Sequence, residues 1–404
     1  MPIAKRFWGT LVFLLLLVAF YAILAAERQE PIGSVRDVYN GSLRTDVEVS
    51  TFRHIDQLFP SSIVPHGKVA YPLPKSPNPL RDLSFTSSGR DYRLEDYLSL
   101  NRVSGLLVIK NGQIVREDYR FGNTEQTRWV SWSLVKSITS TLLGAAIKDG
   151  YVQSLDDPVT RYLPQLSRSA YAGVSIRNLV QMASGVGWSE AYTDPSSDRR
   201  QMLELQIQRR PGAILNFMAT LPRVAPPGTR WNYSTGETHV LGALVRAAVK
   251  RPLAQYLSEK MWAKLGMEAD ATWWLESPGG LEVGGSGLSA RLRDYGRFGV
   301  FVLGGGKAAG GQVVPSGWFP EAGMPKRVGR FLVPYGYMWW SFGPGSQPVH
   351  QGAFEAIGIF GQFIYINPRH NVVIVVWSAR QRPTGSTVVA DEDFFSATVT
   401  ALDR

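Results

Sequence analysis

The stretch Ser131-Trp-Ser-Leu-Val-Lys-Ser137 decides how the rest of the chain is interpreted. It opens an apolar helical pattern in which Ser133 and Lys136 stand three residues apart and therefore share one face. A serine hydroxyl is a weak nucleophile until a neighbouring base accepts its proton. A partly desolvated lysine at a helix start has a lowered pKa and can be that base. Taken alone, the spacing also fits a helix-capping serine beside a solvated lysine.

The residues before and after this stretch predict a hairpin followed by a helix. Two strand-like runs, 105–110 and 113–119, flank Asn111-Gly112, a pair that accepts the positive φ angles of a tight hairpin turn. After Trp132, apolar residues recur at three- and four-residue spacing until Asp149-Gly150 ends the pattern. The serine and lysine are therefore expected where a buried helix begins.

The remainder of the chain indicates one α+β domain. Residues 156–265 predict helices broken by loops, whereas 361–366 and 372–377 predict strands, and a final helix is expected from Asp391 to Leu402. Strands first, helices in the middle and strands last predict an antiparallel sheet flanked by helices, with an all-helical subdomain inserted at about 150–265. The hydrolase domain is placed at 91–404.

Several further motifs carry a family resemblance, which covers roughly Arg93 to Trp377. Together with Ser133 and Lys136, they resemble the serine β-lactamase and penicillin-binding superfamily. Within it, the chain is most similar to the class C-like esterases and the 6-aminohexanoate-dimer hydrolases. The motifs are Leu155-Asp-Asp-Pro-Val159, Tyr162-Leu-Pro164, Ile176-Arg-Asn-Leu179, Pro226-Pro-Gly228 and Trp231-Asn-Tyr233-Ser-Thr235.

The resemblance implies roles for Tyr233 and Thr235. The tyrosine of the family's Tyr-x-Asn motif lies opposite the nucleophile and moves protons to the leaving group, so Tyr233 is expected to do so here. Thr235 stands where the family commonly has asparagine, and it is expected to contact substrate. A threonine hydroxyl lacks the separate donor and acceptor of an amide, which weakens the prediction that β-lactams are the substrates.

Two other stretches are expected to contact the substrate by the same resemblance. His350-Gln351-Gly352 resembles the Lys-Thr-Gly or His-x-Gly strand of the family, in which glycine lets the strand approach the substrate. A backbone N–H of the segment 353–357, together with that of Ser133, would then form the oxyanion hole. Tyr192 and Glu190 fall where amide-hydrolysing relatives carry a loop over the pocket.

The first residues indicate a membrane anchor. Lys5 and Arg6 precede an uncharged apolar run at 8–26, which is about long enough to cross a bilayer as a helix. A cleaved signal peptide is the alternative, but its apolar region is usually only ~7–15 residues long. An anchor at 1–27 would leave the catalytic part outside the inner membrane, in the periplasm. Residues 28–90 are interpreted as a linker and extension, with little regular structure from Glu27 to Pro79.

Composition excludes several other classes. The 404 residues include no cysteine, which excludes disulfides and thiolate chemistry. The formal charge of +10 is scattered singly, so no nucleic-acid partner is expected. The five histidines do not pair at ligand spacing, no Gly-x-Ser-x-Gly elbow is present, and neither a metal nor an organic cofactor is called for.

The sequence therefore predicts a serine hydrolase with a small-molecule or peptide-like ester or amide substrate. Ser133, Lys136 and Tyr233 are the predicted catalytic residues, and acylation by Ser133 is the predicted reaction. Two alternatives stay open. One is a β-lactamase or D-amino-acid peptidase that acts on cell-wall-type substrates, and the other is an inactive relative that binds peptides in the same cleft.

Overall fold

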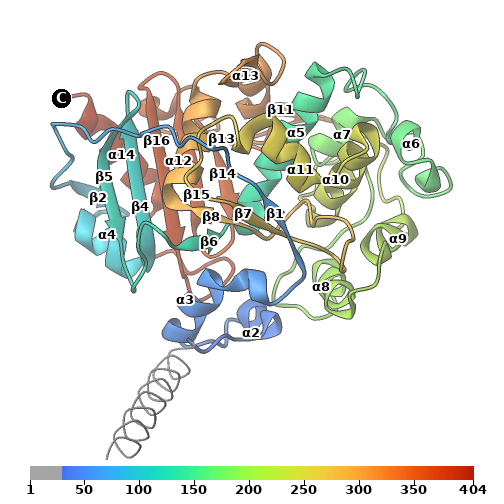
Figure 1. Ribbon diagram of the computed structural model, residues 1–404, viewed down its shortest axis with the longest axis horizontal. Coiled ribbons are helices and arrows are strands. Elements are labelled where there is room, and N and C mark those ends of the chain that lie inside the picture. Colours follow the sequence, from blue (N-terminus) through green and yellow to red (C-terminus); the bar gives the residue numbers. More distant parts are fainter. Residues whose placement is uncertain (1–29) are drawn as a thin grey trace, which may run out of the picture.

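The computed structural model describes residues 30–404, and a six-stranded antiparallel sheet is its centre. Both ends of the chain contribute strands to this sheet, as the sequence predicts, and Figure 1 shows them side by side. In spatial order the strands are β13 (Trp340–Ser341), β14 (Phe354–Gly358), β15 (Gln362–Asn367), β16 (Val372–Ser378), β4 (Val103–Lys110) and β5 (Gln113–Tyr119).

The hairpin between β4 and β5 has the turn that its sequence predicts. Asn111 and Gly112 both have positive φ angles, 51° and 77°. These values match a type I′ turn, whose backbone twist fits that of the two flanking strands. The hairpin fixes the edge of the sheet farthest from β13.

Both faces of the sheet are buried. Leu106 and Val108 of β4 lie in one core with α4 (Leu94–Leu100) and α14 (Asp391–Leu402). The alternate residues of β4 belong to a second, larger core, to which α12 (Leu292–Leu303) contributes. In α12 a Cβ atom at Gly296 would come within 2.5 Å of Leu107, so glycine is what lets the helix lie so close to the sheet.

A helical region lies beside the β13–β14 end of the sheet (Figure 1). The helix α5 (Val135–Lys148) connects it to the sheet, and it contacts both β14 and α10. Between residues 150 and 265 the chain forms helices, in agreement with the predicted inserted subdomain. They are α6 (Val159–Tyr162), α7 (Ile176–Val180), α8 (Asp198–Gln208), α9 (Ala213–Thr220), α10 (Thr235–Val249) and α11 (Leu253–Leu257).

Smaller elements complete the domain. A second antiparallel sheet has the order β1-β7-β8-β6, and it lies next to the turn that carries Ser133. Its strands are β1 (Ser61–Val64), β7 (Ala271–Trp274), β8 (Leu288–Arg291) and β6 (Arg128–Val130). The other strands and the remaining α-helix are β2 (Ser84–Ser87), β3 (Arg90–Arg93), β9 (Lys307–Ala308), β10 (Gly311–Gln312), β11 (Lys326–Val328), β12 (Phe331–Val333) and α13 (Trp318–Gly323).

The prediction of a spacer with little regular structure from Glu27 to Pro79, inside a linker at 28–90, is wrong. This segment forms α2 (Val35–Asn40), α3 (Thr45–Arg53) and β1, which pairs with β7. Tyr39 and Phe52 are buried in the larger core because their partners are aromatic residues far along the chain. The longest part of this segment without helices or paired strands is its proline-rich end, at 65–79, which makes one isolated bridge.

The predicted membrane anchor at 1–27 lies outside the described residues. Within residues 30–404, no helix combines the length and the apolar character that crossing a bilayer requires.

Candidate active site

Ser133 lies in a short 3-10 turn, Trp132–Leu134, that leads directly into α5. The residue before it, Trp132, has a φ of 47°, a strained value for a large side chain. Its ring is completely buried and is held by edge-on and tilted contacts with four aromatic rings, which keep the turn in this conformation. The four rings belong to Tyr39, Phe52, Trp274 and Phe360.

Lys136, one turn later, points back at Ser133. Its Nζ atom lies 2.8 Å from Ser133 Oγ, 2.9 Å from Thr235 Oγ1 and 3.0 Å from the carbonyl oxygen of Gly285. The side chain is only 1% exposed. Burial lowers the pKa of Lys136 to about 7, although the negative charge of Glu190 acts in the opposite direction. A large share of the lysine is therefore neutral near pH 7.

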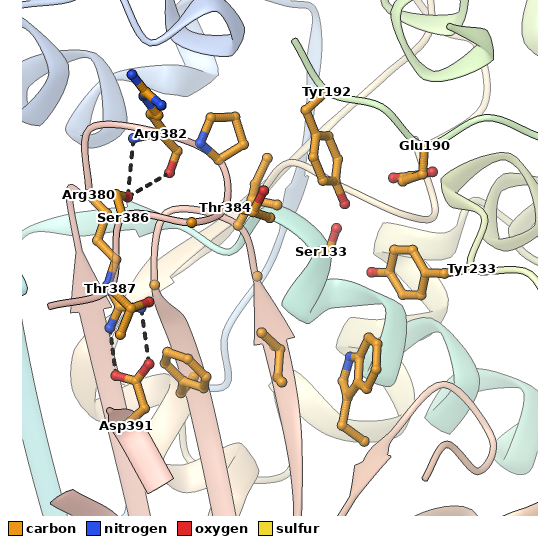
Figure 2. A pocket seen from close by; sticks show the side chains of 18 residues that line it. Ser133, Glu190, Tyr192, Tyr233, Arg380, Arg382, Thr384, Ser386, Thr387 and Asp391 are labelled. Atoms are coloured by element: carbon orange, nitrogen blue, oxygen red, sulfur yellow. Dashed lines mark hydrogen bonds and ion pairs between the residues drawn. The ribbon is translucent and has the colours of Figure 1, made fainter. Parts of the chain in front are cut away.

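Two tyrosines face Ser133 from the other side. Figure 2 shows the hydroxyl groups of Tyr192 and Tyr233 directed toward the serine. The ring of Tyr233 also lies under Lys136, with Nζ 5.0 Å from the ring centroid. Burial raises the pKa of Tyr233, and the negative charge of Glu190 raises it further, so the phenol keeps its proton. Near neutral pH this phenol has a proton to donate, which the predicted role requires.

A pocket of about 440 Å³ opens beside Ser133. Glu190 and Tyr192 line one side of it, as the sequence predicts, and Trp340 and Phe363 add aromatic surface. The far end is formed by the loop 380–387, which follows β16, and by the first residue of α14 (Figure 2). There Arg380 Nη1 donates to Asp391 Oδ2 at 3.0 Å.

Sequence reasoning missed the far end of this pocket. The loop has a composition rich in glycine, proline, serine and threonine, which indicates only that a loop follows the strand. Nothing in the order of its residues indicates that it reaches the nucleophile. Its position follows from the pairing of β16 between β15 and β4.

The predicted contact between Thr235 and substrate is wrong. Thr235 is 1% exposed and does not line the pocket, because its hydroxyl lies between Lys136 and Glu190. Its backbone N–H also donates to Glu190 Oε2 at 2.9 Å. The threonine therefore lies behind Ser133, away from the pocket surface.

His350 and Gly352 do not reach the site either, so both predicted substrate contacts are wrong. The His350 ring is buried in the smaller core, stacked on Phe342, with its Nδ1 atom 2.8 Å from Tyr365 Oη and its Nε2 atom 2.6 Å from Ser396 Oγ. Gly352 is an exposed residue of the turn before β14, and a Cβ atom there would meet nothing within 4 Å.

The glycine that permits a close approach lies six residues later. A Cβ atom at Gly358 would come within 2.3 Å of the carbonyl oxygen of Ser131, so β14 can pack against the nucleophile turn only without a side chain there. Ile357, Gly358 and Ile359 form the wall of the pocket nearest to β14. Of the segment 353–357 expected to supply an oxyanion donor, only Ile357 lines the pocket.

Comparison with known proteins agrees with this geometry. The family model Beta-lactamase matches residues 101–396. The 6-aminohexanoate-dimer hydrolase of Paenarthrobacter ureafaciens is 30% identical over 305 residues, which are 72% of this chain and 76% of that protein. A beta-lactamase of Pseudomonas fluorescens is 25% identical over 187 residues, 44% of this chain and 48% of that protein.

Solved structures share the fold. The structure named "Putative 6-aminohexanoate-dimer hydrolase from Bacillus anthracis" has a TM-score of 0.75 at 24% identity, and the match covers 89% of this chain and 93% of that one. The chain therefore belongs to the beta-lactamase family, within the serine β-lactamase and penicillin-binding protein superfamily, and 6-aminohexanoate-dimer hydrolases are among its homologues.

Proposed function

We propose that this protein is a serine hydrolase that cleaves an ester or a linear amide through an acyl-enzyme on Ser133. The observation that carries the proposal is the 2.8 Å distance from Lys136 Nζ to Ser133 Oγ at the base of a pocket. Burial of the lysine supports it, because a lysine with a pKa of about 7 can accept a proton near neutral pH.

The proton transfers follow from these partners. Ser133 Oγ forms a bond to the substrate carbonyl carbon while its proton moves to Lys136 Nζ, and the carbonyl electron pair moves onto oxygen. When the carbonyl re-forms, the bond to the leaving nitrogen or oxygen breaks, and Tyr233 delivers a proton to that atom. The phenol regains its proton from Lys136. Water then attacks the acyl-enzyme by the same route and restores the serine.

The edge of β14 is the proposed place for the second oxyanion donor. Glu355 and Phe354 pair with β13. Beyond them, β14 has no further strand on that side within residues 30–404, and it approaches the turn of Ser133. Ile357, Gly358 and Ile359 line the pocket there, and a backbone N–H of this segment would complete an oxyanion hole with the N–H of Ser133.

Two observations favour esters or linear amides over β-lactams. The hydroxyl of Thr235 is engaged behind the nucleophile, so it is not available to a β-lactam side-chain amide. The relative of Paenarthrobacter ureafaciens, 30% identical over 305 residues, is named 6-aminohexanoate-dimer hydrolase, and we take the bond between the two units of such a dimer to be a linear amide. A substrate of this class is a small or peptide-like molecule without a ring at the scissile bond.

Covalent labelling of residues 30–404 tests the proposal. The protein and a Ser133→Ala variant are treated with a fluorophosphonate and with labelled penicillin, and adducts are read by intact mass. Phosphonate labelling that depends on Ser133 is expected, with hydrolysis of p-nitrophenyl acetate lost in the variant. Penicillin labelling would move the substrate class to β-lactams or D-peptides, and labelling by neither reagent would favour an inactive peptide-binding relative.

A further inference from the structure

Glu190 is a carboxylate at the pocket whose two oxygens are both occupied by groups of the site itself. Its Oε2 atom accepts from the backbone N–H of Thr235 at 2.9 Å and from the indole N–H of Trp188. Its Oε1 atom accepts from the hydroxyl of Thr235. Three hydrogen-bond donors, two from Thr235 and one from Trp188, therefore hold this one carboxylate in place. These bonds connect Glu190 to the group that contacts Lys136.

The direction of these hydrogen bonds constrains Thr235. A threonine hydroxyl has one proton to donate, and an ionised carboxylate can only accept. The proton of Thr235 Oγ1 is therefore committed to Glu190, and the lone pairs of the oxygen remain for Lys136 Nζ, 2.9 Å away. With Glu190 ionised, Thr235 can accept from the lysine but cannot donate to it.

This constraint sets the orientation of a neutral Lys136. A neutral amine has two N–H groups and one lone pair, and the Nζ atom has three neighbours. The carbonyl oxygen of Gly285 can only accept, so it takes one N–H, and Thr235 takes the other. The lone pair is left for Ser133 Oγ. If Thr235 were free to donate, its hydroxyl would compete for the lone pair that must receive the serine proton.

We propose that Glu190 is a positioning residue which, through Thr235, directs the lone pair of Lys136 at Ser133. This inference rests on the proposed function, because it assigns a role only if Lys136 is the base. Glu190 acts on Lys136 through the hydroxyl of Thr235, so its effect depends on that hydroxyl.

The charges around Lys136 also affect its pKa, which can be measured separately from the rate. Glu190 raises the pKa of Lys136, whereas Arg199 of α8 lowers it. The phenols of Tyr39, Tyr192 and Tyr233 also lie around the site, and burial raises the pKa of each of them, so they are neutral near pH 7. The charged groups of Arg380, Arg382 and Asp391 line the far end of the pocket. Removal of the Glu190 charge therefore lowers the pKa of Lys136.

The experiment measures the second-order rate of Ser133 labelling by a fluorophosphonate between pH 5 and 9, which needs no knowledge of the substrate. The variants are Glu190→Gln, Thr235→Val, Thr235→Ser and the double variant Glu190→Gln/Thr235→Val. Glutamine can accept with one oxygen, but its amide N–H₂ would face a donor in this site. Asp194→Asn is the matched control, since Asp194 is an exposed carboxylate of the same loop.

In Glu190→Gln, the plateau rate is expected to fall about 10-fold or more, since loss of general-base alignment is costly. The midpoint of the acidic limb should move to lower pH. Thr235→Val should lose a similar factor, and Thr235→Ser, which keeps the hydroxyl, should retain most of the rate. In the Thr235→Val background, Glu190→Gln should add less than about two-fold, because its route of action is already lost. Asp194→Asn should leave both rate and midpoint unchanged.

Two results would overturn the inference. One is a Glu190→Gln profile that superimposes on that of the unmodified protein, and the other is an equal loss from this substitution with and without the Thr235 hydroxyl. Thermal unfolding is followed for each variant. If Glu190→Gln does not fold, the contrast between Thr235→Val and Thr235→Ser, both of which keep the carboxylate, decides the matter. Failure of the proposed function appears differently, as labelling that persists in Ser133→Ala.

Discussion

Lys136 Nζ lies 2.8 Å from Ser133 Oγ, and both side chains are almost completely buried. Since the base must be neutral, the rate of Ser133 acylation should rise with pH through a midpoint of about 7 and then level off. Lys136→Met should lower kcat/KM by about 10²-fold or more and remove this midpoint. A profile of p-nitrophenyl acetate hydrolysis from pH 5 to 10 makes the measurement, and a flat profile would contradict the assignment of the base.

Tyr233→Phe should affect amides more than activated esters. An amine leaving group must receive a proton, whereas p-nitrophenolate leaves without one. We expect kcat for an anilide to fall by about 10²-fold, with a much smaller loss for the p-nitrophenyl ester. Parallel steady-state kinetics on the two substrates make the comparison. Equal losses on both would indicate that Tyr233 acts on the serine or the pocket shape and not on the leaving group.

Gly358→Ala should impair catalysis by moving β14 away from the nucleophile turn. The added Cβ atom would come within 2.3 Å of Ser131 O, so one of the two segments must shift. Displacement of a reacting group by about 1 Å can cost about 10²-fold in rate. Gly343→Ala is the control, since its nearest contact would be 3.9 Å away. Similar esterase rates in the two variants would argue against an oxyanion donor in this part of β14.

Tyr39→Phe should destabilise the whole domain. The buried guanidinium of Arg199 donates to Tyr39 Oη and stacks on the same ring at 4.7 Å. Loss of the hydroxyl leaves a buried charged donor without this partner, at a cost of about 1–3 kcal/mol. Urea unfolding gives the free energy, with Tyr71→Phe, at an exposed tyrosine, as the control. No change in the Tyr39 variant would show that water replaces the phenol.

His350→Ala should reduce stability and leave Ser133 labelling intact in the folded protein. Burial lowers the pKa of His350 below 6.5, so the unfolded chain binds the proton first as the pH falls. The contribution of this residue to stability is therefore present above pH 6.5 and lost below it. We expect a cost of about 1–3 kcal/mol at neutral pH, and a weaker acid destabilisation in the variant. Loss of labelling by the folded variant would indicate that His350 does contribute to the active site.

The parts of the fold that the sequence predicts correctly are those set by local pattern. The Asn111-Gly112 turn and the helix at Asp391–Leu402 need only neighbouring residues to be recognised, and the structure confirms both. The grouping of Ser133, Lys136 and Tyr233 also matches the structure, because the first two are one helical turn apart and a family motif marks the third. Their catalytic roles stay predictions.

The errors concern contacts between distant residues. His350 belongs to a motif-like triplet, but the pocket wall starts only at Ile357, because the chain makes a turn before β14 begins. Thr235 stands at the expected position in the family motif. Its hydroxyl, however, bonds to Glu190 from another loop, and the residue does not line the pocket. Neither the turn before β14 nor the contact between Thr235 and Glu190 can be predicted from the residues next to these positions.

Because α2 and α3 pack under the turn that carries Ser133, the smallest unit that can fold begins before α2 and not at residue 91. Tyr39 and Phe52 form the underside of Trp132, so a fragment that starts at residue 91 would expose a set of aromatic rings to water. Such a fragment should aggregate when it is expressed. A recombinant catalytic fragment must instead start before Ser34, whose hydroxyl accepts from the backbone N–H of Asp37 and caps α2.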